Sequence, residues 1–207
     1  MTTATLRLAR YSDIAALAVL QAQLYHAEAP GALRGPLDRQ HALLRYVLEG
    51  DPRGLRRRYV WTDAHDTAIA TASLQIPGDL LIGFTPPGTV QRAFALLGFT
   101  NALRLIGTLV RVSLASNGPS NRTCAYIHSV VVDERMRGQG IGHALMLAME
   151  DEVRQHGVET VQLRVVVGNH GARRLYERLG YTMIGRTPRW LDWATFPTEL
   201  MEKRLIL

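Results

Sequence analysis

A glycine-rich segment of the type that binds phosphate groups spans residues 137–142, Arg-Gly-Gln-Gly-Ile-Gly. It lies between a β-branched stretch and residues whose apolar side chains have helical spacing. Glycine lets the backbone bend tightly and lets a ligand approach the N–H groups. The first N–H groups of a helix lack internal partners, and the helix dipole favours negative charge beside them. Backbone amides could therefore hold a diphosphate here, with Arg137 adding positive charge.

Two common nucleotide-binding motifs do not fit this segment. A dinucleotide fingerprint needs G-x-G-x-x-G/A, but its last position is His143 when counted from Gly138 and Leu145 when counted from Gly140. The Gly-Lys-Ser/Thr of a P-loop is absent from the sequence. The segment is therefore neither of these nucleotide sites.

The segment does satisfy Q/R-x-x-G-x-G/A, the acetyl-CoA motif of the GCN5-related N-acetyltransferase (GNAT) family. Residues 169–181, Asn-His-Gly-Ala-Arg-Arg-Leu-Tyr-Glu-Arg-Leu-Gly-Tyr, resemble the family's N-x-x-A-x-x-L-Y-x-x-x-G-F/Y segment. Residues 130–133 are similar to the strand that precedes the family's motif. Two motifs in the family's order make the resemblance strong over residues 126–185, and it is weaker over most of the remaining chain.

The resemblance implies an acetyl-CoA site built from three segments. The strand that holds Val130 splays from its neighbour, its free backbone groups hold the pantetheine arm, and an N–H near Val130 polarises the thioester carbonyl. The glycine-rich turn wraps the diphosphate, and Asn169 contacts the pantetheine side. No metal is implied. The implied cofactor-binding residues are Val130, Val131, Val132, Arg137, Gly138, Gln139, Gly140, Ile141, Gly142, His143 and Asn169.

Tyr176 matches the residue that protonates the departing CoA thiolate in the family. A phenol with a pKa of about 10 is only modestly suited to protonate a thiolate whose pKa is about 8.5, so its surroundings must help. The alternative is that Tyr176 only packs in the core with Ala172, Leu175 and Leu179.

The attacking amine must lose a proton, because an alkylammonium has a pKa of about 10.4. His128 is the candidate base. On a regularly alternating strand it shares a face with Val130 and Val132, one step from the acyl site. The stretch Tyr126-Ile-His128 resembles the His-Leu-His of serotonin-type arylalkylamine N-acetyltransferases, with the first histidine replaced. The alternative is a strand histidine whose hydrogen bonds are satisfied within the fold.

Strands and helices that alternate along the chain must position these residues, which predicts an α/β protein. The resemblance implies one domain over residues 1–207, with a mixed central sheet of about seven strands that is splayed between strands 4 and 5 and flanked by helices. Residues 79–120 are a mostly apolar, helical insertion that serves as a lid or wall over the acceptor site or as a dimer contact. The predicted strands are 5–9, 58–62, 67–74, 126–132, 159–167, 181–186 and 200–206, and the predicted helices begin near residues 12, 37, 141 and 169.

The net charge of +6 comes almost entirely from arginine and favours anionic partners, or reflects a general preference for arginine over lysine. Residues 53–58 are expected to be a solvated charge run rather than a nucleic-acid patch, because no aromatics interleave. The single cysteine, Cys124, excludes a disulfide framework and a multi-cysteine zinc site. No signal-peptide core and no uninterrupted apolar run of about 20 residues is present. We therefore expect a cytoplasmic protein without membrane or nucleic-acid partners; a homodimer is left open.

Together these features predict an N-acetyltransferase in which a primary amine attacks acetyl-CoA directly in a ternary complex. The apolar insertion favours a small arylalkyl or other small amine. Trp190 and Trp193 lie before the last strand, where they either touch the acceptor or pack. Three alternatives stay open: a protein N-terminal or lysine acetyltransferase, a catalytically silent acyl-CoA-binding regulator, and a nucleic-acid binder.

Overall fold

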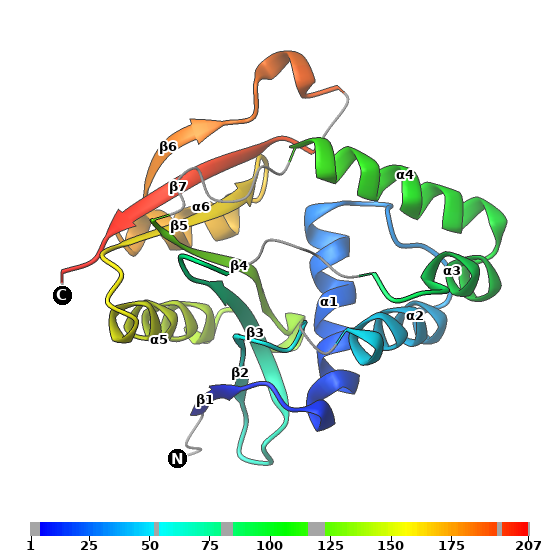
Figure 1. Ribbon diagram of the computed structural model, residues 1–207, viewed down its shortest axis with the longest axis horizontal. Coiled ribbons are helices and arrows are strands. Elements are labelled where there is room, and N and C mark those ends of the chain that lie inside the picture. The colour runs from blue at the N-terminus through cyan, green and yellow to red at the C-terminus, as the bar shows by residue number, and fades with distance from the viewer. Residues whose placement is uncertain (1–4, 52–53, 80–84, 116–122, 194–195, 207) are drawn as a thin grey trace.

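The computed structural model describes residues 5–51, 54–79, 85–115, 123–193 and 196–206, with the backbone alone for 112–115. The strands are β1 (Thr5–Leu8), β2 (Arg58–Thr62), β3 (Ala68–Gln75), β4 (Ala125–Val132), β5 (Thr160–Val166), β6 (Thr182–Arg186) and β7 (Thr198–Arg204). The helices are α1 (Ile14–Glu28), α2 (Leu37–Gly50), α3 (Thr89–Leu97), α4 (Phe99–Ala115), α5 (Ile141–Gln155) and α6 (His170–Arg178), with 3₁₀ turns η1 (Tyr11–Asp13), η2 (Glu134–Met136) and η3 (Arg189–Leu191). The glycine-rich segment thus connects β4 to α5, as predicted (Figure 1).

The seven strands form one mixed sheet in the order β1-β2-β3-β4-β5-β7-β6. Only β4 and β5 are parallel neighbours, and their pairing joins residues 125–127 to residues 161–163. Beyond that point β4 continues to Val132, while β5 remains paired with β7 as far as Val166. The two strands therefore splay apart and leave facing backbone edges without a common ladder. The predicted seven-stranded sheet, splayed between β4 and β5, is confirmed.

A β-bulge interrupts β4 just where it leaves β5. Ser129 has a φ of 53°, in the left-handed region that non-glycine residues rarely adopt. The β3–β4 register pairs Ser73 with His128 and Thr71 with Val131, so β4 uses one more residue than β3 over this stretch. One extra residue turns the side chains that follow it to the other face of the sheet.

The bulge separates residues that a regular strand would keep together. Val130 and Val132 pack against the core beneath α5, whereas Val131 joins the core beneath α1. His128, before the bulge, lines a cavity that α1 borders. The expectation that His128 shares a face with Val130 and Val132 is therefore wrong, because the left-handed backbone at Ser129 breaks the alternation.

Helices cover both faces of the sheet (Figure 1). On one face α5 and α6 pack on the strands through a core that includes Leu145, Met149 and Tyr176. On the other face α1, α2, α3 and α4 enclose a second core, which includes Leu17 and Leu20. The central strands β3 and β4 are thus held between α1 and α5, which fixes the position of the splay.

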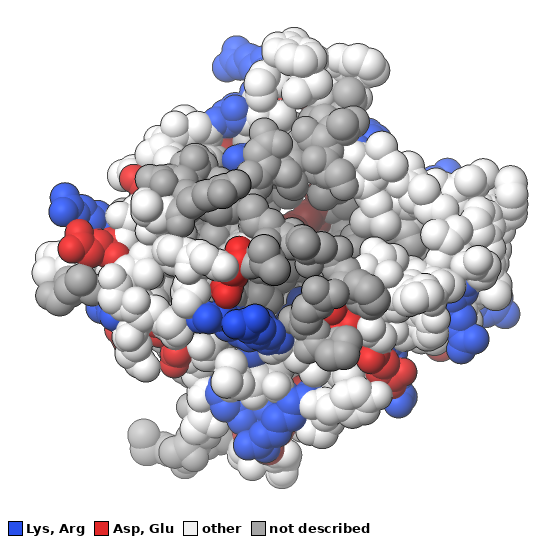
Figure 2. Space-filling model, in the orientation of Figure 1, with Lys and Arg blue, Asp and Glu red and all other residues white. Residues whose placement is uncertain are grey.

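Within the predicted insertion, residues 89–115 form two helices rather than one. Gly98 separates α3 from α4 and has a φ of 77°, a conformation that favours glycine. The surface over α3 and α4 is largely uncharged, and Phe99, Leu103 and Val110 are exposed there (Figure 2). Residues 80–84 and 116–120 of the predicted insertion lie outside the described residues. Among the described residues, no helix is long and apolar enough to cross a bilayer.

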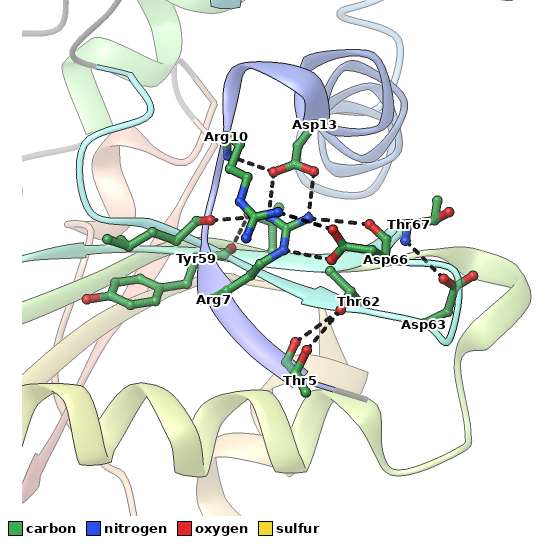
Figure 3. A network of polar contacts seen from close by, with 11 residues as sticks. Thr5, Arg7, Arg10, Asp13, Tyr59, Thr62, Asp63, Asp66 and Thr67 are labelled. Atoms are coloured by element: carbon green, nitrogen blue, oxygen red, sulfur yellow. Dashed lines mark hydrogen bonds and ion pairs between the residues drawn. The ribbon is translucent and has the colours of Figure 1, made fainter. Parts of the chain in front are cut away.

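A charged cluster joins β1, the turn after β2 and the start of α1 (Figure 3). Arg7 Nη1 lies 2.7 Å from an oxygen of Asp13, and Arg7 Nε lies 2.8 Å from an oxygen of Asp66. Asp13 is the N-cap residue of α1, but its carboxylate accepts hydrogen bonds from Arg7 and from the N–H of Arg10 rather than from the helix. Burial alone would raise the pKa of Asp13, but these hydrogen bonds lower it below its ordinary value.

Candidate active site

The N-terminus of α5 has the geometry of an anion site. Gly138 and Gly140 have φ values of 78° and 80°, so both need the left-handed backbone that glycine adopts without strain. Gly140 caps α5 without a side-chain hydrogen bond, and the first helical bond runs from the N–H of Ala144 to the carbonyl of Gly140. The N–H groups of residues 141–143 precede that bond, and nothing in α5 itself can accept from them.

These amides open into a cleft of about 600 Å³ at the splay. Of the eleven predicted cofactor residues, all but Gln139 line it. Gln139 is exposed and lies outside the lining. The lining also holds residues that were not predicted, chiefly Leu24, Glu28, Met136, Arg164 and Arg178.

The charge of the cleft suits a diphosphate. Arg137, Arg178 and His143 line it, whereas Glu28 is the only carboxylate among its described lining residues. Arg137 Nε donates to the carbonyl of Val132 at 3.1 Å, which holds the guanidinium beside the helix N-terminus. Backbone donors, a helix dipole and flanking arginines together fit the phosphorylated part of a coenzyme.

The remaining predicted residues form the inner wall of the cleft. Residues 130–132 present a β4 edge that β5 does not pair with. Asn169 caps α6, because its side-chain oxygen accepts from the N–H of Ala172 at 3.2 Å. Residues 130–132 and Asn169 thus line the part of the cleft predicted to hold the pantetheine arm. Their contact with that arm stays a prediction.

Tyr176 lines the same cleft and is 5% exposed. Burial, and then the negative charge of Glu28, raise its pKa well above the ordinary value. The phenol is therefore protonated at neutral pH and is available as a hydrogen-bond and proton donor. Tyr176 belongs both to the core and to the cleft wall, so the two roles considered for it do not exclude each other.

A second, smaller cavity of about 250 Å³ adjoins the cleft. Leu24, Glu28 and Arg164 line both spaces, which places the junction between α1 and β5. Its wall includes Leu109 of α4, so the insertion contributes a wall to this cavity. The other described residues that line it are Gln21, Tyr25, Ala29, Tyr126, His128, Ser129, Val166, Phe196 and Thr198.

His128 lines the smaller cavity but not the cleft. Its Nδ1 lies 3.1 Å from Ser129 Oγ, and its ring lies 5.8 Å from that of Tyr126. The His128 side chain is exposed to the cavity, but the surrounding walls limit its hydration. This desolvation, and then the charge of Arg58, lower the pKa of His128 to about 4. His128 is therefore neutral at pH 7 and only weakly basic.

The Arg58 that influences His128 was not predicted as part of the site. It was expected in a solvated charge run, but it begins β2 and is 7% exposed. Its Nε donates to Ser73 Oγ at 3.2 Å, and Ser73 is the cross-strand partner of His128. Burial lowers the pKa of Arg58 from its ordinary value, and the residue brings positive charge toward the smaller cavity.

Glu28 lines both spaces but was not predicted as a site residue. It ends α1 and its carboxylate lies between the two cavities, where burial raises its pKa to about 7. The available signal was its spacing: Glu28 follows Leu24 by one helical turn and Gln21 by two, so a carboxylate extends the inward face of the helix.

The tryptophans do not form part of either wall. Trp190 and Trp193 are 71% and 83% exposed, so neither packs in the core, and neither lines the cleft or the smaller cavity. From the same loop region, Phe196 lines the smaller cavity and lies 4.8 Å from the guanidinium carbon of Arg111 in α4.

Comparison with known proteins identifies the family. The profile of the Acetyltransferase (GNAT) family matches residues 32–181, so the chain belongs to this family. It is 33% identical over 72 residues to the L-methionine sulfoximine/L-methionine sulfone acetyltransferase of Pseudomonas paraeruginosa, which is 31% of this chain and 42% of that protein. The matches span less than half the length of the curated relatives.

Solved structures agree on the fold. An N-acetyltransferase from Staphylococcus aureus Mu50 superposes with a TM-score of 0.64 at 15% identity, covering 96% of this chain and all of that one. The yncA structure from Salmonella typhimurium, solved with its cofactor acetyl-CoA, has a TM-score of 0.57 at 17% identity, covering 99% of this chain and 95% of that one.

Proposed function

We propose that this protein is an N-acetyltransferase that transfers an acetyl group from acetyl-CoA to the primary amine of a small molecule, with both substrates bound together. The observation that carries this proposal is the meeting of two spaces at the splay. One is a cleft with exposed helix amides, and the other is a small cavity that adjoins the cleft at Glu28 and Arg164.

Acetyl-CoA supplies an acetyl thioester, and the residues of the cleft suit its parts. The amides of residues 138–143 and the Arg137 guanidinium bind the diphosphate. The free β4 edge at residues 130–132 and the Asn169 side bind the pantetheine arm. The N–H of Val130 donates toward the thioester carbonyl, where a donor fixed before the reaction is most effective. Tyr176 Oη donates its proton to the departing sulfur.

Direct transfer to the amine is supported by the place of the only cysteine. Cys124 is buried and lies outside the linings of both spaces. The acceptor nitrogen itself is therefore the nucleophile in this proposal.

The smaller cavity favours a small acceptor. Its volume of about 250 Å³ is suited to a compact molecule rather than to a folded protein surface. Tyr126, Phe196 and Leu109 offer apolar contact, while Glu28 offers negative charge to an amine. The Pseudomonas relative is named for small amino-acid derivatives, which is consistent with an acceptor of this size.

Two measurements test the proposal. Titration calorimetry should detect acetyl-CoA binding, and a panel of small amines should release free CoA thiol only when amine is present. Peptides with a free N-terminus or a lysine complete the panel. Binding of acetyl-CoA without amine-dependent thiol release would favour the acyl-CoA-binding regulator, and turnover of the peptides alone would favour a protein acetyltransferase.

A further inference from the structure

Glu28 occupies a unique position among the described residues that line the two spaces. It is the only carboxylate in either lining, and it belongs to both. Leu24 and Arg164 share this position, but neither can accept a proton from an amine at neutral pH. A group that takes a proton during transfer must lie where the two substrates meet, and Glu28 lies there.

The carboxylate is available to a substrate. Within the described part of the chain, the Glu28 carboxylate forms no hydrogen bond or ion pair. The Glu28 side chain is only partly buried, and neither of its oxygens is a fully buried atom without a partner. An acceptor-only group that faces a cavity without a protein donor is suited to bind the N–H groups of an amine.

The groups around Glu28 come from four elements. Tyr25 precedes it on α1, Tyr126 lies on β4, Arg164 on β5 and Tyr176 on α6. After burial, the negative charge of Glu28 raises the pKa values of Tyr25 and Tyr176, and it contributes to the rise of Tyr126 to about 12. All three phenols therefore stay protonated at neutral pH, and Arg164 is the cation of the junction.

The alternative base, His128, is less suited. It lies before the bulge and lines the smaller cavity alone, away from the cleft that holds the thioester. Burial and the charge of Arg58 hold its pKa near 4, whereas burial holds the pKa of Glu28 near 7. A base whose pKa lies near the working pH combines the correct ionisation state with useful basicity.

We propose that Glu28, at the junction of the two cavities, is the general base that binds the acceptor amine and takes its proton. This inference rests on the proposed function. The amine reacts in its neutral form, after its ammonium proton has passed to solvent. As the nitrogen bonds to the acetyl carbon and the carbon–sulfur bond breaks, one nitrogen proton moves to a Glu28 oxygen. The sulfur takes the phenolic proton of Tyr176, and the Glu28 proton then restores the phenol, so that amide and free thiol are the products.

The first test compares three variants in amine-dependent thiol release. Glu28→Gln keeps the size of the side chain and should lower kcat by about 10²–10⁴-fold, the usual contribution of a general base. His128→Gln changes the wall of the acceptor cavity and is expected to alter KM, but it should lower kcat by less than about tenfold, far less than the loss of a general base. Glu49→Gln, at a partly exposed carboxylate of α2 that pairs with Arg45 away from both spaces, is the matched control for the change of charge and should keep the turnover of the wild type. Circular dichroism and acetyl-CoA affinity should be unchanged in all three.

The pH profile gives a second readout. A base must be unprotonated, so kcat/KM of the wild type should rise with pH through an acidic limb near 7. Glu28→Gln should lose this limb, and Glu28→Asp should restore part of the rate with a limb of its own. A profile that keeps its limb in Glu28→Gln, with turnover near wild type, would overturn the inference.

A third readout does not depend on catalysis. Infrared difference spectra of the free protein should show one carboxyl that titrates near pH 7 and is missing in Glu28→Gln. If amine-dependent turnover is found but this signal is absent and Glu28→Gln is fully active, the inference fails while the proposed function stands. If the wild type releases no thiol with any amine, the proposed function fails, and so does this inference, which rests on it.

Discussion

A buried ion pair between Glu150 and Lys203 links α5 to the sheet, and removing one partner alone should destabilise the protein. Glu150 lies in α5 with no exposed surface, and its Oε2 accepts from Lys203 Nζ of β7 at 2.6 Å. Arg154 Nη2 lies farther away, at 3.9 Å, and the second Glu150 oxygen has no hydrogen-bond partner among the described residues. Lys203→Met would therefore leave a buried carboxylate with one distant cation.

The expected cost follows from that loss. Removing one partner of a buried pair typically costs about 3–5 kcal/mol. Arg154 can move toward Glu150 and compensate in part, so about 3 kcal/mol is expected, a large share of the 5–15 kcal/mol by which domains are usually stable. In contrast, Glu150→Leu combined with Lys203→Met replaces the pair by apolar groups, and this double variant should lie close to wild type.

Urea unfolding followed by circular dichroism measures both effects, with the slope of the transition checked for each variant. Glu150→Leu alone completes a double-mutant cycle, in which the two single losses should exceed the double loss by about 2 kcal/mol or more. A loss below about 1 kcal/mol for Lys203→Met, or singles that simply add, would refute the reasoning.

Three further predictions concern the cofactor site and the N-terminal cluster. Gly140→Ala should weaken acetyl-CoA binding in calorimetry. Gly98→Ala, at another open position with a positive φ, should cost about 1–3 kcal/mol of stability without changing affinity. Equal affinities of the Gly140→Ala variant and the wild type would contradict the anion site. Tyr176→Phe should lower kcat by about 10²-fold or more at unchanged acetyl-CoA affinity, and full turnover would exclude the acid role. The lowered pKa of Asp13 means that the unfolded chain binds its proton more readily, so this stability is present above about pH 4 and is lost as pH falls through the folded pKa. Arg7→Ala should destabilise the protein at neutral pH and flatten that acid loss in denaturation curves, and an unchanged acid slope would argue against the ion pair.

Most of the scaffold could be predicted from hydrophobic periodicity and from two motifs. Strands and helices differ in period, so β4, α5 and α6 are readable from the spacing of their apolar side chains. The glycine-rich turn is equally readable, because an anion site on backbone amides depends on glycine and on a helix start. For this reason the predicted cofactor residues line one cleft, with the exception of the exposed Gln139.

The acceptor side was less predictable because it depends on long-range packing and on one unusual backbone angle. Serine has no particular preference for the left-handed backbone, so the bulge at Ser129 could not be predicted from the sequence. This bulge places His128 and Val130 on opposite faces of the sheet. Arg58 lies in an arginine-rich run, and only the strand that begins there buries it. Glu28 acquires its properties from elements far away in the sequence, which meet only in the folded protein.

The β4 bulge divides the strand into two parts that line different spaces. Tyr126 and His128, before it, line the smaller cavity that we propose for the amine, whereas Val130 and Val132, after it, line the cleft that we propose for the coenzyme. Variation at the first pair can exchange one acceptor for another while the donor surface stays constant. In an uninterrupted strand the two sets would share a face, and every change of specificity would also disturb the thioester.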